Sequence, residues 1–136
     1  MTSQATRIEH DLLGEKAVPA DAYYGVQTAR GLENFHISGV ELRLYPNVIK
    51  AFAMVKLAAA RANFDCGQSS AEILKGMEGA CQELIEGKLH GEFRLDVFQG
   101  GAGTSTNMNA NEVIANRALE LMGHKKGEYK SCSPHD

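Results

Sequence analysis

The chain has 136 residues, a formal net charge of −3 and a pI near 5.9. This length fits one domain and is short for a complete multidomain enzyme. The slight negative charge argues against a general nucleic-acid-binding protein, which usually carries a basic surface. No apolar run is long enough to span a bilayer, and the first residues do not resemble a secretory signal. We therefore expect a cytoplasmic protein without nucleic-acid or membrane partners.

The three cysteines, Cys66, Cys81 and Cys132, are far apart in the sequence and odd in number. No Cys-X-X-Cys motif occurs, and no Cys/His spacing is typical of a zinc site. We expect reduced thiols, with Cys81 buried, and no metal site.

The N-terminal part is expected to form a short hairpin. Residues 1–6 are expected to be a frayed end. Residues 7–18 mix apolar and charged side chains around Gly14, and Pro19 closes the segment. This pattern predicts a hairpin or a pair of extended segments.

A helix is expected next. Asp21 can cap a helix that begins at Ala22, and Gly31 weakens its later part. Residues 32–44 show no clear periodicity, so we expect a linker there.

The second helix is expected to start at Pro46, because the missing N–H of proline costs nothing in a first turn. Apolar residues are dense from 48 to 62, and only Lys50, Lys56 and Arg61 mark a polar side. We expect this helix to be buried on most sides, in a helical bundle or a subunit interface.

The third helix has the clearest pattern. Ser69 and Glu72 form a capping-box pattern, and Gly87 offers a left-handed stop. Apolar residues between these ends follow the i, i+3, i+4, i+7 spacing of one helix face. They are Ile73, Leu74, Met77, Ala80, Cys81, Leu84 and Ile85.

Residues 93–98 are expected to form a short extended piece that enters a glycine-rich turn. A fourth helix is expected from about Thr106 to Met122, with Gly123 ending it. No internal repeat or linker divides the chain.

The segment from Gln99 to Glu112, QGGAGTSTNMNANE, carries the strongest chemical signal. Its glycines let the backbone approach a ligand closely. A helix that starts just afterwards presents unpaired N–H groups and the positive end of its dipole. Thr104, Ser105 and Asn107 add neutral donors without a fixed positive charge. These features suit a small anion, either a carboxylate or a phosphate.

Known phosphate motifs do not fit this segment. A Walker A loop needs a lysine after its last glycine, and a dinucleotide fingerprint needs glycine where Thr106 stands. A tight turn, with Thr104 or Ser105 as a helix cap, accounts for the same residues. The residue types alone leave the anion-binding and capping interpretations open.

Four longer stretches carry a family resemblance: RIEHDLLGE (7–15), PADAYYGVQTARGLENF (19–35), QGGAGTSTNMNANEVIANRALELMG (99–123) and KGEY (126–129). With these stretches the chain resembles the aspartase/class II fumarase superfamily. The phrases GGAGTSTNMN and DAYYGVQT and the absence of tryptophan favour the aspartase branch. A class II fumarase fragment stays the alternative.

The resemblance implies a mainly α fold with a small extended or β N-terminal part. Residues 1–136 would form the N-terminal domain, ending before the central helical-bundle domain. The family reaction is a reversible anti-elimination, without an organic cofactor, that turns L-aspartate into fumarate and ammonia. It is carried out by homotetramers whose active sites combine three subunits. By position, Thr104, Ser105 and Asn107 would contact the β-carboxylate of the substrate.

The resemblance also implies that the catalytic residue of the family is not among residues 1–136. The family's catalytic serine lies on a GSSxMPxKxNP loop, which does not occur here, so we expect no catalytic residue in this chain and no activity from it alone. A non-catalytic module that binds a dicarboxylate or another subunit is a further alternative. The final SPHD matches part of a secondary carboxylate site of fumarases, but His135 replaces the usual asparagine, and we assign it no role.

Overall fold

The computed structural model describes residues 5–135 and is mainly helical, with one two-stranded antiparallel sheet. This confirms the expected fold class. The strands are β1 (Thr6–Asp11) and β2 (Gly14–Pro19), and the helices are α1 (Val26–Asn34), α2 (Pro46–Asp65), α3 (Ala71–Ile85) and α4 (Thr104–Leu121). Two short 3-10 turns lie between helices: η1 (Leu42–Leu44) between α1 and α2, and η2 (His90–Glu92) between α3 and α4.

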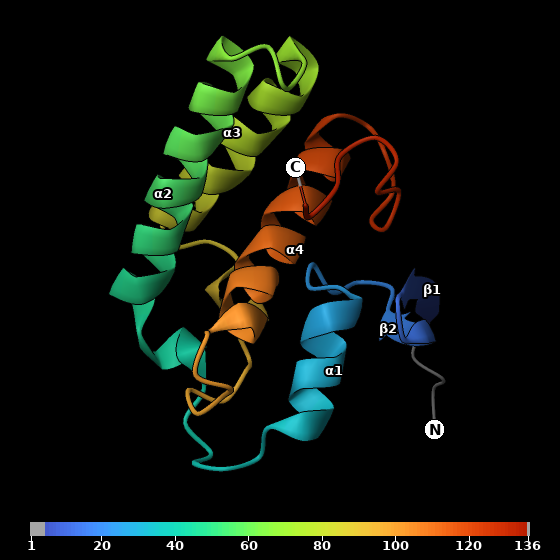
Figure 1. Ribbon diagram of the computed structural model, residues 1–136, viewed down its shortest axis with the longest axis vertical. Coiled ribbons are helices and arrows are strands. Elements are labelled where there is room, and N and C mark those ends of the chain that lie inside the picture. Colours follow the sequence, from blue (N-terminus) through green and yellow to red (C-terminus); the bar gives the residue numbers. More distant parts are fainter. Residues whose placement is uncertain (1–4, 136) are drawn as a thin grey trace.

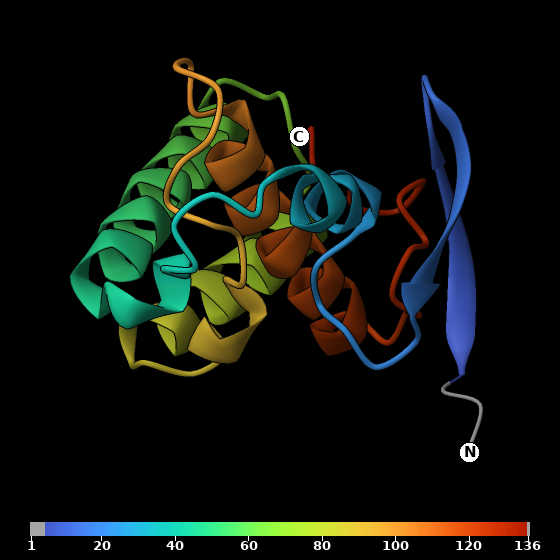
Figure 2. The same ribbon diagram turned by 90° about the horizontal axis from the view of Figure 1, so that it is seen from below.

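Helix α4 is the centre of the fold. It lies between the α2–α3 pair on one side and α1 on the other, and the β1–β2 hairpin lies beyond α1 (Figure 1). Figure 2 shows the same order from below, with the hairpin at one edge. Ten of the 18 residues of α4 are buried. The position of α4 therefore decides how the rest of the chain is arranged.

The predicted hairpin is confirmed, with Arg7 paired to Val18 in an antiparallel register. Residues 1–4 of the expected frayed end lie outside the described residues. The expectation is wrong for residues 5 and 6, because Ala5 O accepts the N–H of Ala20 at 2.9 Å and Thr6 pairs with Pro19.

Helix α1 begins at Val26 rather than Ala22, with Gly25 as its N-cap. The predicted start is wrong because Glu112 and Glu9 accept the N–H groups of Gly25 and Val26, at 2.8 and 2.9 Å. In a helix that began at Ala22, these groups would bond carbonyl oxygens four residues earlier. The helix continues to Asn34, so the connection to α2 is shorter than the expected linker.

Helix α2 starts at Pro46 as predicted, but it is not buried on most sides within the described chain. One face packs against α3 and η1. On the other sides, Val48, Met54 and Val55 keep 42%, 54% and 64% of their surface exposed. The apolar residues of α2 therefore cover more of its circumference than the described chain can bury.

Helix α3 matches its prediction closely. The cap is Ser70 rather than Ser69: its Oγ accepts the N–H of Ile73 at 3.2 Å. Gly87, with a φ of +94°, follows the helix end as predicted. The difference of one residue arises because either serine could accept this bond, and only the backbone geometry selects between them.

Close contact between α3 and α4 depends on Gly76. A Cβ added at this position would lie 2.9 Å from Met122 Sδ and 3.2 Å from Ala118 O. Buried residues of α3, among them Ala80 and Leu84, extend the same face. This glycine therefore sets how near the two helices can lie.

The expected burial of Cys81 is confirmed; Cys132 is also buried and Cys66 is exposed, and no disulfide joins the three cysteines. Among residues 5–135, no helix is both long and apolar enough to cross a membrane. The same residues contain no cluster of His, Cys, Asp and Glu side chains that could hold a metal ion.

Candidate substrate-binding site at the start of α4

Helix α4 begins at Thr104, two residues earlier than predicted, and its N-cap is Gly103 in the left-handed region with a φ of +72°. Glycine has no side chain that could accept a hydrogen bond from the first N–H groups of the helix. The side chain of Gln99, in the loop before the helix, caps it instead: its Oε1 accepts the N–H of Thr106 at 3.0 Å. The interpretation of Thr104 or Ser105 as a helix cap is therefore wrong.

The loop before α4 is held at its base while its glycines project from the body of the protein (Figure 2). Gln99 Nε2 donates to Asp96 O at 3.0 Å. The Asp96 carboxylate accepts backbone N–H bonds from Ser38, Gly39 and Phe98, at 2.8, 2.9 and 2.8 Å. Although burial opposes the charged form, these bonds hold the pKa of Asp96 well below its usual range. The loop therefore starts from a fixed point.

The three predicted site residues lie on two sides of the first turn of α4. Residues three positions apart on a helix are neighbours, whereas adjacent residues are turned by about 100°. Thr104, which is exposed, and Asn107, which is half-buried, are therefore brought together. Ser105 lies on the α1 side, where its Cβ is 3.8 Å from the position a Cβ would take at Gly31.

A lysine missed by the sequence analysis reaches this turn from α2. Lys56 Nζ donates to Asn107 Oδ1 at 2.7 Å. Thr104, Ser105 and Asn107 themselves add only neutral donors, and Lys56 brings a positive charge beside them. Burial lowers the pKa of Lys56 from its usual value. In the sequence Lys56 is one of three charged residues, with Lys50 and Arg61, that mark the polar side of this helix. Only the packing of α2 beside α4 gives it Asn107 as a partner.

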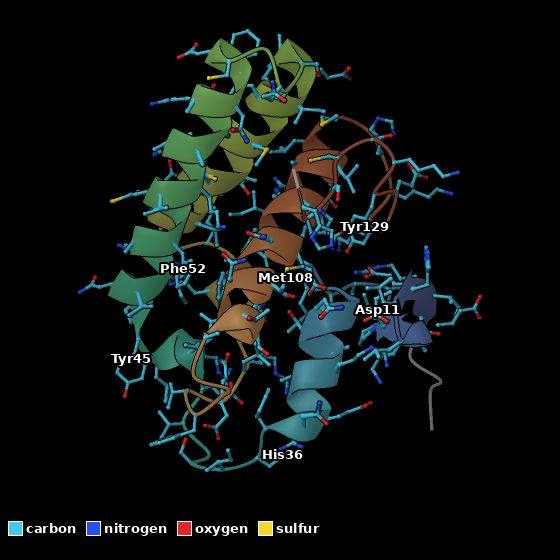
Figure 3. All side chains as sticks on the ribbon, in the orientation of Figure 1. Asp11, His36, Tyr45, Phe52, Met108 and Tyr129 are labelled. Atoms are coloured by element: carbon cyan, nitrogen blue, oxygen red, sulfur yellow. The ribbon has the colours of Figure 1, made fainter. Side chains whose placement is uncertain are left out.

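Lys56 and Asn107 lie at one edge of a groove along α2. The rest of the groove is lined by Asn47, Val48, Ala51, Phe52 and Val55. Figure 3 labels Phe52 on α2 and Met108 on α4. The groove thus combines an apolar wall with an ammonium and an amide.

A second cluster of polar groups lies at the start of α1. Glu112, only 1% exposed, accepts the backbone N–H groups of Gly25, Gln27 and Thr28 at 2.8, 2.7 and 3.0 Å. Glu9 Oε2 accepts the N–H of Val26 at 2.9 Å. Burial raises the pKa of Glu112 against the effect of these bonds. The N-terminus of α1 is thus satisfied by two carboxylates distant in sequence.

The segment after α4 completes this cluster. Tyr129 Oη, from that segment (Figure 3), donates to Glu9 at 3.1 Å, and Asn116 Nδ2 donates to Tyr129 Oη at 2.9 Å. A Cβ added at Gly25 would lie 2.6 Å from Tyr129 Oη and 2.9 Å from Glu112 Cδ. All four stretches that carry the resemblance contribute here. The residues of this cluster thus account for part of each stretch by their role in the fold.

The comparisons with known proteins agree with this architecture. A model of a family described as lyase matches residues 14–135. The chain is 57% identical over 132 residues to aspartate ammonia-lyase of Pseudomonas aeruginosa and 50% identical over 135 residues to that of Escherichia coli. These alignments cover 97% and 98% of the chain, but only 28% of each relative.

Solved structures give the same result. The native form of fumarate lyase:delta crystallin from Brucella melitensis superposes with a TM-score of 0.95 at 52% identity, covering 97% of this chain and 31% of that one. Class II fumarase from Schistosoma mansoni superposes with a TM-score of 0.85 at 38% identity, covering 91% and 26%. Since the family model matches nearly all of the sequence, the chain belongs to this lyase family.

Proposed function

We propose that the chain is the N-terminal domain of a cytoplasmic, homotetrameric aspartate ammonia-lyase. That enzyme converts L-aspartate to fumarate and ammonia, and this domain supplies part of its substrate pocket. The observation that carries the proposal is the start of α4. There a glycine-rich loop held at its base, Thr104, Asn107 and the Lys56 ammonium come together. The higher identity to relatives named aspartate ammonia-lyase than to the class II fumarase supports the choice of substrate.

The chemistry explains why such a site is useful. Removal of a proton from Cβ leaves negative charge that spreads into the neighbouring carboxylate, and preorganised donors stabilise charge as it develops. The backbone N–H groups of Thr104 and Ser105 have no acceptor among residues 5–135. With the Thr104 hydroxyl and the Asn107 amide, they provide donors for the β-carboxylate. Ser105 is the contact at the α1 edge of the proposed site.

Catalysis requires residues outside this chain. The chain spans about 28% of the length of its curated relatives, and the serine loop expected from the family is not in its sequence. The exposed apolar side chains of α2 support packing against the rest of the protein or another subunit. The isolated chain is therefore expected to be inactive.

A chimaera tests the proposal. This chain replaces the 132 aligned residues of the Pseudomonas aeruginosa relative, and fumarate formation is followed by ultraviolet absorbance. We expect the chimaera to form fumarate from L-aspartate, whereas the 136-residue chain alone forms none. A folded, assembled chimaera that acts on L-malate and leaves L-aspartate unchanged would favour the class II fumarase alternative. A robust rate from the isolated chain would contradict the proposed division of the active site.

A further inference from the structure

We propose that Lys56 is a positioning residue that fixes the side-chain amide of Asn107 so that its NH2 group, and not its oxygen, faces the substrate carboxylate. This inference rests on the proposed function and adds a residue from α2 to it.

The first step is the chemistry of the contact between Lys56 and Asn107. Lys56 Nζ and Asn107 Oδ1 are 2.7 Å apart. An ammonium has three donors and no acceptor, so only the amide oxygen can face it at this distance. Lys56 therefore determines which end of the amide is bound.

The second step is what remains free on Asn107. No described residue accepts a hydrogen bond from its Nδ2. With Oδ1 bound to Lys56, the amide offers its environment only N–H donors. A carboxylate has only acceptors, so this orientation matches it, whereas the flipped amide would set oxygen against oxygen.

The third step is that Lys56 itself is held in place. Its side chain lies between the groove along α2 and a small cavity of about 80 Å³ on the other side, which is also lined by Asn63, Asn111 and Ser133. Its partial burial and its hydrogen bond to Asn107 limit the rotamers that the long side chain can take. A partly buried lysine therefore serves better here than a lysine in solvent, because less freedom is lost when substrate binds.

Variants in the active chimaera test the inference. Lys56→Met keeps the length of the side chain and removes its donors, so we expect kcat/KM for L-aspartate to fall roughly 10- to 100-fold. Lys56→Arg also offers only donors and should recover most of the loss. Lys50→Met, on the same helix, is the matched control and should leave kcat/KM unchanged. A Lys56→Met chimaera with unchanged kcat/KM would overturn the inference while leaving the proposed function intact.

A double-mutant cycle separates positioning from direct binding. If Lys56 acts through Asn107, adding Lys56→Met to Asn107→Ala should reduce kcat/KM by less than about twofold further. Independent, multiplicative losses would mean that Lys56 contacts the substrate itself, and would overturn the positioning role.

A spectroscopic measurement on the 136-residue chain needs no activity. The side-chain NH2 resonances of Asn107 should shift in Lys56→Met, return toward their original position in Lys56→Arg and stay unchanged in Lys50→Met. Unchanged Asn107 resonances in a folded Lys56→Met chain would show that the amide is not held by Lys56. An inactive chimaera carrying native Lys56 would instead count against the proposed function.

Discussion

Two helix N-termini in this protein meet the same physical demand in opposite ways. The first N–H groups of any α-helix lack partners within the helix, and they attract negative charge. At α1 the chain supplies that charge itself, through Glu9 and Glu112. At α4 no carboxylate of residues 5–135 accepts the N–H groups of Thr104 or Ser105, and Lys56 lies nearby instead.

The difference separates a structural carboxylate site from the proposed binding site. The α1 site is buried, closely packed and built from four distant stretches of sequence, so changes there should affect folding. The α4 site is partly exposed and is reached by a glycine-rich loop, so changes there should affect ligand binding and leave the fold intact. The following predictions test this separation, from the largest expected effect on stability to the smallest.

Gly25→Ala should have the largest effect. The added Cβ would lie 2.6 Å from Tyr129 Oη and 2.7 Å from Glu9 Oε2, so the polar cluster must move apart. We expect a loss of about 3 kcal/mol in the free energy of unfolding, measured by urea denaturation. Gly101→Ala, where nothing lies within 4 Å, is the control and should change stability by less than about 0.5 kcal/mol. Equal effects at the two glycines would contradict the comparison.

Glu112→Gln should be the next most damaging. The substitution keeps the shape of the side chain but replaces one acceptor oxygen with a donor, opposite three backbone N–H groups. We expect a loss of about 2 kcal/mol in the free energy of unfolding. The exposed Glu86→Gln substitution should leave the urea midpoint unchanged. A neutral effect of Glu112→Gln would mean that α1 does not need this carboxylate.

Asp96→Asn should show its effect through pH. Because the folded pKa of Asp96 is lowered, its contribution to stability is present above the unfolded value of 3.8 and is lost as the pH falls toward the folded pKa. Thermal unfolding should therefore show a lower Tm for the variant near neutral pH. It should also show a shallower loss of Tm in acid than the native chain. Parallel Tm profiles for the two proteins would contradict this assignment.

Thr104→Ala should have the smallest effect on folding. The residue is exposed in the first turn of α4, and we expect the free energy of unfolding to change by less than about 0.5 kcal/mol. In the active chimaera the same substitution should lower kcat/KM for L-aspartate by at least about tenfold, because a donor to the carboxylate is lost. A large loss of stability with little change in kcat/KM would reverse the roles given to the two helix ends.

Local patterns in the sequence predicted most of the elements. The hairpin, the start of α2 at Pro46 and the apolar face of α3 follow from turn residues and periodicity, which act over a few positions. The start of α1 could not be found in this way. Its N–H groups are accepted by Glu9 and Glu112, and the second of these lies 84 or more residues away in the sequence. No local capping rule includes such a partner.

The candidate site shows the same limit. Its glycines, hydroxyls and amides stand together in one segment, and the sequence therefore indicated an anion site at Thr104, Ser105 and Asn107. Lys56 was missed because it comes from another helix, 51 residues before its partner. The helix also turns Ser105 away from Asn107, although the two are close in sequence.

The bond between Tyr129 and Glu9 joins residues 120 positions apart. During synthesis, the hairpin and α1 emerge from the ribosome long before the segment that carries Tyr129. Glu112 and Asn116 also arrive late, so the early part of the chain must wait for most of its polar partners. Contacts of such high sequence separation slow folding, because the entropy of closing a long loop is lost before the contacts form. Docking of the segment after α4 is therefore expected to be among the last steps in forming this fold.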